Sequence, residues 1–377
     1  MLNNPGSHEG KRIAMAIRLK DIAQDLGVSV VTVSKVVRGR RDIGEATRKR
    51  VLKRMRELNY RPNMMARGLA SGQTYTVGLV VPDLVQPYFA ELAKYLGGVL
   101  RTANRALILA SSEDDPRIEQ DEIRALLVRG IDVLLLASCQ KSLKNLYEIN
   151  DQRTPYVLLD RNFPQLEANF VGMDDFRAGE MATEHLIGLG RKRIAHIAGK
   201  AIYPSRERMR GYKTALESSG LLQPAGYLLE KEKLEMQGDA AGYQCMKQLL
   251  QLKERPDAVF CYNDVTAIGA MHAVHDAGLR IPNDIAFVGC GNVGYSHYLR
   301  CPLTSIDQCI PEQGRVAAAL ALGLDGGSDQ PPKKVMLSPK LVVRASTAGF
   351  VTPAGMGQAN GKQSKVSRRM NSRERTR

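Results

Sequence analysis

Residues 19–37, LKDIAQDLGVSVVTVSKVV, constrain the fold of this chain more than any other stretch. Apolar residues recur at helical spacing before Gly27 and again after Ser29, which predicts two short amphipathic helices. Gly27 suits a left-handed turn, and Ser29 is a favourable N-cap for the second helix. That helix keeps hydroxyl and cationic side chains outside its apolar face. Such a helix can enter a major groove, whereas the alternative is a plain helical hairpin within an ordinary core.

The positive charge of the chain is concentrated at its two ends. The 377 residues carry a net charge of +15, and residues 1–75 hold 16 Lys and Arg against 6 Asp and Glu. Residues 351–377 hold 7 against 1, and the segment between them is close to neutral. A cationic head on a neutral body indicates a polyanionic partner, because binding neutralises phosphates and releases counterions. A merely solubilising surface would not require this segregation.

Cysteine usage and hydropathy predict a cytoplasmic protein. The six cysteines show no CxxC pair and no zinc-type spacing, so we expect buried thiols in a reducing compartment. No apolar run is long enough to span a membrane, and the first residues lack the apolar core of a signal peptide. We expect no metal, no cofactor and no membrane partner, and Met15 is an alternative start.

A third helix and a linker follow the first two helices. Gly44 stands at the expected N-cap, and Val51, Met55 and Leu58 form the inward face of the third helix. Pro62 disfavours helix at the residue before it, and a short helix over residues 64–70 can begin after Asn63. Seven residues cannot hold a helix alone in water, so we expect a partner to order this segment. The alternative is a plain linker.

From residue 76 the sequence alternates between buried strands and helices. Short runs rich in Val and Leu predict parallel strands at TVGLVV, ALILAS, DVLLLA and YVLLD, with helices over 87–102, 118–129 and 142–152. A second run predicts strands near FVGMD, RIAHIA, YLLEKE, DAVFCY and DIAFVG, with helices near 176–189, 206–219, 239–252 and 265–277. Two such runs predict two doubly wound α/β lobes with a ligand at the carboxyl ends of their strands. The residues at those ends are Asp83, Tyr88, Phe89, 111–114, Asp160, Arg161, Asp174, Asp175, Asn263, Asp264, Gly291 and Asn292.

Several motifs in residues 18–350 together resemble the LacI/GalR family of bacterial transcription regulators. They are LKDIAQDLGVSVVTVSKVV, ELNYRPNMMARGLASG, VGLVVPDLVQPYFAEL, GRKRIAHIAG and DIAFVGCGNVGYSHYLRCPLTSIDQ. The resemblance implies a small all-α helix-turn-helix headpiece and a periplasmic-binding-protein-like core of two lobes. It also implies a homodimer on a double-stranded, pseudo-palindromic DNA operator, with a small-molecule effector between the lobes. Such a protein is a repressor more often than an activator, lies on the nucleoid and is no enzyme.

The resemblance assigns DNA contacts to individual residues. Val30, Val31 and Lys35 match positions that read base edges, and Lys35 is the best polar reader among them. Leu69 matches a leucine that wedges into the minor groove. Contacts to the DNA backbone are expected from Leu19, Ser29, Thr32, Ser34, Arg38, Tyr60 and Asn63.

The resemblance also assigns residues to the effector cleft. Beyond the strand-end residues Asp83, Tyr88, Phe89, Asp160, Arg161, Asn263, Asp264 and Asn292, it adds Arg208 and Gln237. Gly291 replaces an aspartate that commonly holds a ligand hydroxyl or amine, and an aromatic that often stacks on the ligand is replaced near Gln237. Both departures count against a familiar monosaccharide or purine effector. The resemblance as a whole still implies a sugar or a related metabolite as the effector.

These assignments divide the chain into five parts. We expect a disordered extension (1–17), the headpiece (18–61), a hinge helix and linker (62–74), the two-lobed core (75–350) and a disordered basic tail (351–377). The first lobe is expected over 75–161 and 293–325, and the second over 162–292 and 326–350.

Two other functions fit parts of the sequence. GCGNVG, residues 289–294, matches the G-x-G-x-x-G pattern of dinucleotide-binding enzymes. A helix would have to begin there, but Pro302 follows soon after, and Asp307 comes too early for the acidic residue that binds the ribose. A free-standing solute-binding protein would share the two-lobed fold, but it would need no cationic headpiece and would carry an export signal.

Overall fold

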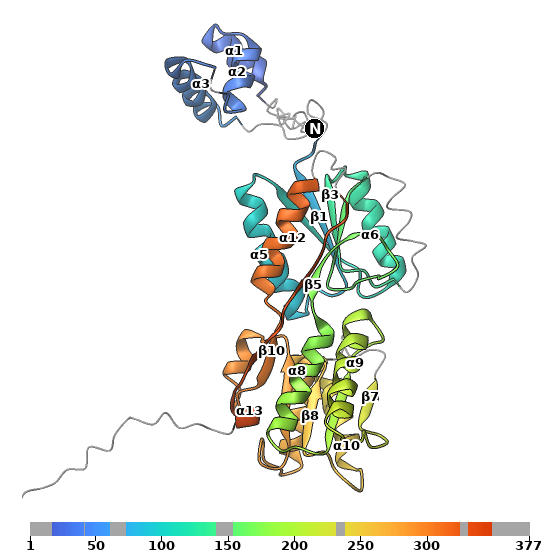
Figure 1. Cartoon of the computed structure of the whole chain (residues 1–377). Helices are drawn as coiled ribbons and strands as arrows, with labels where there is room; N and C mark the ends of the chain where they lie inside the picture. The colour runs from blue at the N-terminus through green and yellow to red at the C-terminus, as the bar shows by residue number, and fades with distance from the viewer. Residues whose placement is uncertain are drawn as a thin grey trace, which may run out of the picture.

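The computed structural model describes residues 17–40, 42–60, 73–140, 154–230, 238–324 and 331–348. Three helices form a small headpiece, and the described residues from 73 onward form two α/β lobes (Figure 1). The predicted fold class is therefore confirmed. The predicted extension, hinge and tail fall almost entirely outside the described residues.

The headpiece consists of α1 (Leu19–Leu26), α2 (Val30–Val37) and α3 (Glu45–Glu57) around one core. Gly27 takes the left-handed conformation at the end of α1, and the Ser29 hydroxyl accepts a 3.0 Å hydrogen bond from the backbone N–H of Thr32. Both predictions for this turn are confirmed. One residue from each helix anchors the core, since Ile22, Val33 and Val51 are completely buried.

The first lobe is a parallel six-stranded sheet in the order β11-β5-β4-β3-β1-β2. Helices α5 (Pro87–Thr102) and α12 (Ile310–Leu324) pack on one face of this sheet, and α6 (Pro116–Val128) packs on the other. Its strands are β1 (Thr76–Val81), β2 (Ala106–Ser111), β3 (Val133–Leu136), β4 (Tyr156–Leu159), β5 (Asn169–Met173) and β11 (Lys334–Leu337).

The second lobe has a six-stranded sheet in the order β12-β10-β9-β8-β6-β7, parallel except for β12. Its strands are β6 (Ile194–Ala198), β7 (Leu228–Glu230), β8 (Ala258–Cys261), β9 (Ala286–Cys290), β10 (Thr304–Asp307) and β12 (Lys340–Val342). Its helices are α8 (Asp175–Gly188), α9 (Tyr203–Ser218), α10 (Gly238–Leu250), α11 (Asp264–Asp276), the short α13 (Ala345–Ala348) and the 3-10 turn η1 (Gly294–His297).

The predicted division of the chain between the lobes is wrong in three places. FVGMD forms β5, which pairs with β4 in the first lobe, and β11 pairs with β5 there as well. Strand β10 pairs with β9 in the second lobe rather than joining the first. The chain therefore crosses between the lobes after β5, after β10 and after β11. A buried parallel strand has the same apolar pattern in either sheet, so the pattern cannot show which sheet it joins.

Most predicted elements have the expected bounds, with small shifts at their ends. Helix α6 begins at Pro116 and α9 at Tyr203, because proline is well accommodated in the first turn of a helix. Strand β7 ends at Glu230, and the helix predicted over 142–152 lies outside the described residues.

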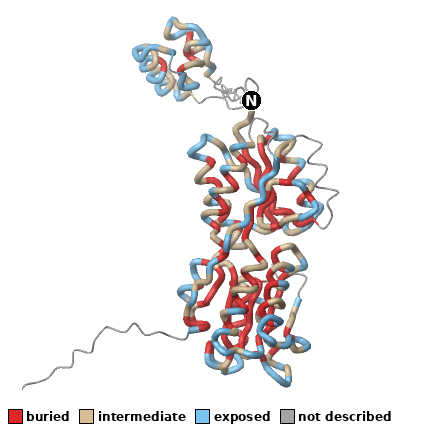
Figure 2. Tube along the Cα trace, in the orientation of Figure 1, coloured by how far each residue is buried: buried red, intermediate tan, exposed pale blue. Residues whose placement is uncertain are grey.

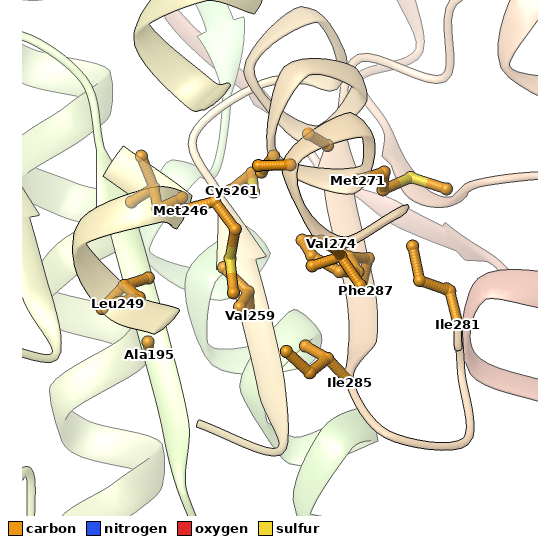
Figure 3. Close-up of a cluster of buried hydrophobic side chains, with 14 of the residues drawn as sticks. Ala195, Met246, Leu249, Val259, Cys261, Met271, Val274, Ile281, Ile285 and Phe287 are labelled. Carbon is orange, nitrogen blue, oxygen red and sulfur yellow. The ribbon is translucent and has the colours of Figure 1, made fainter. Parts of the chain in front are cut away.

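Each lobe has its apolar core on both faces of its sheet, and exposed residues cover the outside of the helices (Figure 2). Figure 3 shows part of the apolar cluster of the second lobe, which includes Met246 of α10, Met271 of α11, Val259 of β8 and Phe287 of β9. Five of the six cysteines are buried as free thiols, and Cys309 is half-buried. Of the described helices, none combines the length and apolarity needed to cross a bilayer.

A completely buried histidine on β6 makes the stability of the second lobe sensitive to pH. His196 donates from Nδ1 to the Phe260 carbonyl at 2.9 Å and stacks on the Phe260 ring, and its Nε2 has no partner among the described residues. Burial lowers the pKa of His196 from 6.5 to about 4. As the pH falls from 6.5 to about 4, His196 becomes protonated in the unfolded chain but stays neutral in the folded lobe, so the free energy of unfolding falls with the pH.

We expect acidification from pH 7 to about pH 4 to cost about 3 kcal/mol through His196 alone. Urea unfolding followed by circular dichroism measures this loss. The variant H196L should show a shallower pH dependence than the native chain, whereas H272N, at an exposed position, should match the native chain. Parallel pH profiles for all three proteins would contradict the assignment.

Candidate functional site

The N-terminal part of α2 presents the residues that were predicted to read bases. Val30 is 45% exposed and Val31 is 63% exposed, although α2 buries Val33 and Val36 on its other side. The hydroxyls of Ser29 and Thr32 lie 2.8 Å apart in the capping turn. Two apolar side chains and two hydroxyls therefore share one exposed end of this helix, which suits contact with thymine methyl groups and with phosphates.

The cationic side chains of α2 are held by neighbours within the headpiece. Lys35 Nζ donates to Asp42 Oδ2 at 2.6 Å, and this bond holds the pKa of Asp42 below its usual value. Arg38 donates to the Ser34 hydroxyl from Nε at 3.1 Å and from a terminal nitrogen at 2.6 Å. These side chains are thus oriented on the surface rather than left to sample all rotamers.

Two residues predicted to contact the DNA backbone also support the headpiece core. Leu19 and Tyr60 are half-buried and pack against the cluster around Ile22. A contact from Leu19 to DNA would therefore use its backbone N–H, which lies in the first turn of α1. Asn63 and Leu69 lie outside the described residues.

The two lobes enclose a narrow inner chamber of about 50 Å³ at the carboxyl ends of their strands. The first lobe contributes Tyr88, Phe89 and Asp160, and the second contributes Arg208, Asn263, Asp264 and Gly291. These seven predicted residues are brought together from distant parts of the sequence. Tyr88 donates from its hydroxyl to Gln313 Oε1 at 2.6 Å, and burial raises its pKa well above the usual value.

Arg208 is the charged centre of the inner chamber. It is 2% exposed and lies on α9, where its Nε and a terminal nitrogen each approach Asp175 Oδ1 at 2.8 Å. Another terminal nitrogen donates to the Tyr262 carbonyl at 2.8 Å, and the guanidinium lies 4.9 Å from the centre of the Tyr262 ring. Burial raises the pKa of Asp175, and the Arg208 guanidinium opposes that shift. Arg208 is therefore a fixed cation that already has a carboxylate partner.

An outer chamber of about 310 Å³ adjoins the inner one, and Gln86, Pro87 and Val265 line both. Its other lining residues include four carboxylates, Asp83, Glu113, Asp114 and Asp239. Asp114 of the first lobe forms ion pairs with Lys200 of the second lobe and, at 2.9 Å, with Arg161 of the first. The Lys200–Asp114 pair thus links the two lobes beside the outer chamber.

Some predicted cleft residues have structural partners instead. Asn292 is tied by hydrogen bonds to Asp307 and Arg344, and Arg161 is buried against Asp114, so neither lines a chamber. Asn263 lines the inner chamber, but its Oδ1 caps α11 by accepting a bond from the Thr266 N–H at 2.8 Å. Gln237 lies outside the described residues.

Asp264 shapes the floor of the inner chamber. It is 1% exposed and accepts hydrogen bonds from the Ser305 and Ser296 hydroxyls and from the Val293 N–H. Gly291 has φ +136°, so any side chain here would be strained, and a Cβ would point at the Asp264 carboxylate 3.7 Å away. The turn η1 follows, so no α-helix begins at GCGNVG as a dinucleotide site would require.

The sequence analysis missed seven of the residues that line the inner chamber: Gln86, Pro87, Tyr262, Val265, Cys290, Val293 and Gln308. Tyr262 and Cys290 stand one position before the predicted strand-end residues, so a wider window at those ends would have found them. Gln308 follows β10, a strand that the sequence analysis did not predict, within a range that it had assigned to the other lobe. Its Nε2 donates to Cys290 Sγ at 3.4 Å, and its buried Oε1 has no partner within the described chain.

Comparison with known proteins gives matches along most of the chain. Residues 18–63 match the family described as bacterial regulatory proteins, lacI family, and residues 183–347 match a periplasmic binding protein-like domain. The HTH-type transcriptional regulator DegA of Bacillus subtilis is 30% identical over 90% of this chain and 100% of its own length. The HTH-type transcriptional repressor PurR of Haemophilus influenzae is 31% identical over 88% of this chain and 99% of its own. A solved structure of the transcriptional regulator CelR in complex with cellobiose shares 28% identity and a TM-score of 0.65, covering 88% of this chain and 99% of that one.

Proposed function

Because this chain belongs to the LacI family of bacterial DNA-binding transcription regulators, we propose that it is a repressor controlled by a small-molecule effector. It binds a pseudo-palindromic operator as a homodimer, with one headpiece on each half-site. The observation that carries this proposal is the occurrence, in one chain, of an exposed α2 surface and a cleft between two lobes.

The proposed repressor contacts DNA through the exposed surface of its headpiece. Val30 and Val31 meet thymine methyl groups, and Lys35 reads a guanine. The hydroxyls of Ser29, Thr32 and Ser34, together with Arg38 and Tyr60, lie along the phosphates, as does the first turn of α1 at Leu19. Outside the described residues, Asn63 contacts the DNA backbone and Leu69 wedges into the minor groove.

The charges of the cleft indicate what kind of effector it takes. Three cations lie in or beside the chambers, and each already pairs with a carboxylate: Arg208 with Asp175, and both Lys200 and Arg161 with Asp114. In the described chain, Asp83, Glu113 and Asp239 form no ion pair and face the outer chamber. An anionic effector would therefore meet repulsion, whereas hydroxyl or amine donors would find acceptors, including Gln308 Oε1.

A sugar without phosphate or carboxylate groups fits these acceptors. Tyr88, Phe89 and Tyr262 supply aromatic surface, and the two chambers together approach the size that small-ligand sites need. The solved CelR complex with cellobiose supports an effector of this class. The proposed function needs no cofactor and no catalytic group. We propose that the protein acts in the cytoplasm, on the nucleoid.

Control of DNA binding follows from the way the chain passes three times between the lobes. An effector that binds one arrangement of the lobes better than another shifts the population toward it, and only that difference in affinity changes DNA binding. Reorientation of the lobes changes the spacing of the paired headpieces. Such a reorientation acts on the Lys200–Asp114 pair, because this pair joins the two lobes.

Selection of bound duplexes from a random DNA pool at about 0.15 M salt tests this function. We expect enrichment of a two-fold-symmetric site, and we expect cellobiose or a related neutral sugar, but not glucose 6-phosphate, to change its occupancy. Retention of all duplexes alike would contradict sequence-specific regulation. An effect of the phosphorylated sugar alone would contradict the proposed effector class.

A further inference from the structure

Lys35, the polar base reader of the proposed function, is engaged by a carboxylate of its own headpiece. Asp42 lies in the segment between α2 and α3, and its Oδ2 accepts a 2.6 Å hydrogen bond from Lys35 Nζ. The two side chains are 43% and 53% exposed. An ion pair this exposed contributes little to stability, so stabilisation alone gives no reason for a carboxylate on a DNA-binding surface.

The other carboxylates of the described headpiece have different partners. Asp21 accepts a hydrogen bond from the backbone N–H of Arg18 at the start of α1. Asp25 and Glu57 both pair with Arg54 of α3. Glu45 pairs with Lys49 within α3. Asp42 is thus the carboxylate that touches a predicted base-reading side chain.

We propose that Asp42 is a specificity-determining residue that positions Lys35 and makes its contact with DNA depend on the correct base. This inference rests on the proposed function. A lysine ammonium has three donors, and Asp42 uses one, so two remain for the O6 and N7 acceptors of a guanine. The pair therefore survives on the correct site, where the carboxylate restrains a flexible side chain.

On other DNA the same carboxylate is unfavourable. Without a guanine in reach, Lys35 can contribute only by neutralising phosphate, and it must either leave Asp42 or bring that negative charge toward the backbone. Asp42 therefore weakens binding to non-specific duplexes more than binding to the operator. A regulator must find one site among a large excess of others. Asp42 helps because it increases the ratio of operator affinity to non-specific affinity.

The test compares charge-matched variants of the full chain. The variants D42N and E45Q each remove one exposed negative charge from the headpiece, but only D42N releases Lys35. Fluorescence anisotropy at about 0.15 M salt measures the Kd of each for the duplex selected above and for a scrambled duplex. The variants K35A and D42N/K35A complete a double-mutant cycle, and melting curves confirm that each protein is folded.

We expect D42N to tighten binding to the scrambled duplex about fivefold or more, and to change operator binding by less than about twofold. E45Q should shift both affinities by the same small factor, and in the K35A background D42N should behave like E45Q. If D42N also shifts both affinities equally in the native background, Asp42 is only a surface charge and the inference is wrong. A native chain that binds both duplexes equally would instead refute the proposed function itself.

Discussion

Replacing Asp175 with alanine is expected to lower the free energy of unfolding of the second lobe by about 3–5 kcal/mol. The reason is the charge that the variant leaves behind. Arg208 is 2% exposed, and Asp175 is the carboxylate that neutralises it inside the lobe. Without Asp175, the guanidinium keeps only its neutral partners, such as the Tyr262 carbonyl, while remaining cut off from water. Urea unfolding followed by circular dichroism suits this measurement, because the chain has no tryptophan.

A double variant separates the buried charge from the packing of these side chains. D175L/R208M removes both charges and replaces them with apolar groups, so it should recover most of the stability that D175A loses. The same double variant should fail to respond to any effector that binds the native chain, because Arg208 lines the inner chamber. A free energy of unfolding for D175A within about 1 kcal/mol of the native value would show that water reaches Arg208 and that the pair is not truly buried.

The sequence analysis singled out Asp175 and Arg208 separately but did not predict their contact. Asp175 was a candidate because it follows a strand, and Arg208 because of a family resemblance, but no spacing joins two residues that lie on different helices. The rule that ligands gather at the carboxyl ends of parallel strands does not depend on which lobe a strand joins. It predicted six residues of the inner chamber: Tyr88, Phe89, Asp160, Asn263, Asp264 and Gly291. Gln308 was missed because the sequence analysis predicted no strand at β10, so it had no strand end there to examine.

The headpiece was predictable almost residue by residue, and the physical reason is its local character. Helix periodicity, the Gly27 turn and the Ser29 cap all act within a few residues, and the observed bounds of α1 and α2 follow them. The contact between Lys35 and Asp42 is also close in sequence, but oppositely charged residues seven positions apart give no recognisable pattern when a loop lies between them.

Sequence periodicity does not predict where two helices approach closely enough for their backbones to touch. Helices α8 and α9 touch through Gly179 and Gly211, where each glycine faces the backbone of the other helix. A Cβ at Gly179 would come within 2.8 Å of the Arg208 Cα, and one at Gly211 within 2.6 Å of the Glu180 nitrogen. Backbone cannot rotate aside as a side chain can, so the helices would have to separate.

The variant G179A should therefore destabilise the second lobe by about 3 kcal/mol and displace α9, which carries Arg208. Weaker binding of the effector should accompany the lower urea midpoint. The matched control is G188A at the end of the same helix, where a Cβ would meet nothing within 4 Å. This control should be neutral or more stable by up to about 1 kcal/mol, because alanine favours helix over glycine. Equal effects of the two substitutions would mean that helix propensity governs α8. A loss confined to G179A would mean that the close approach of two backbones holds Arg208 in the cleft.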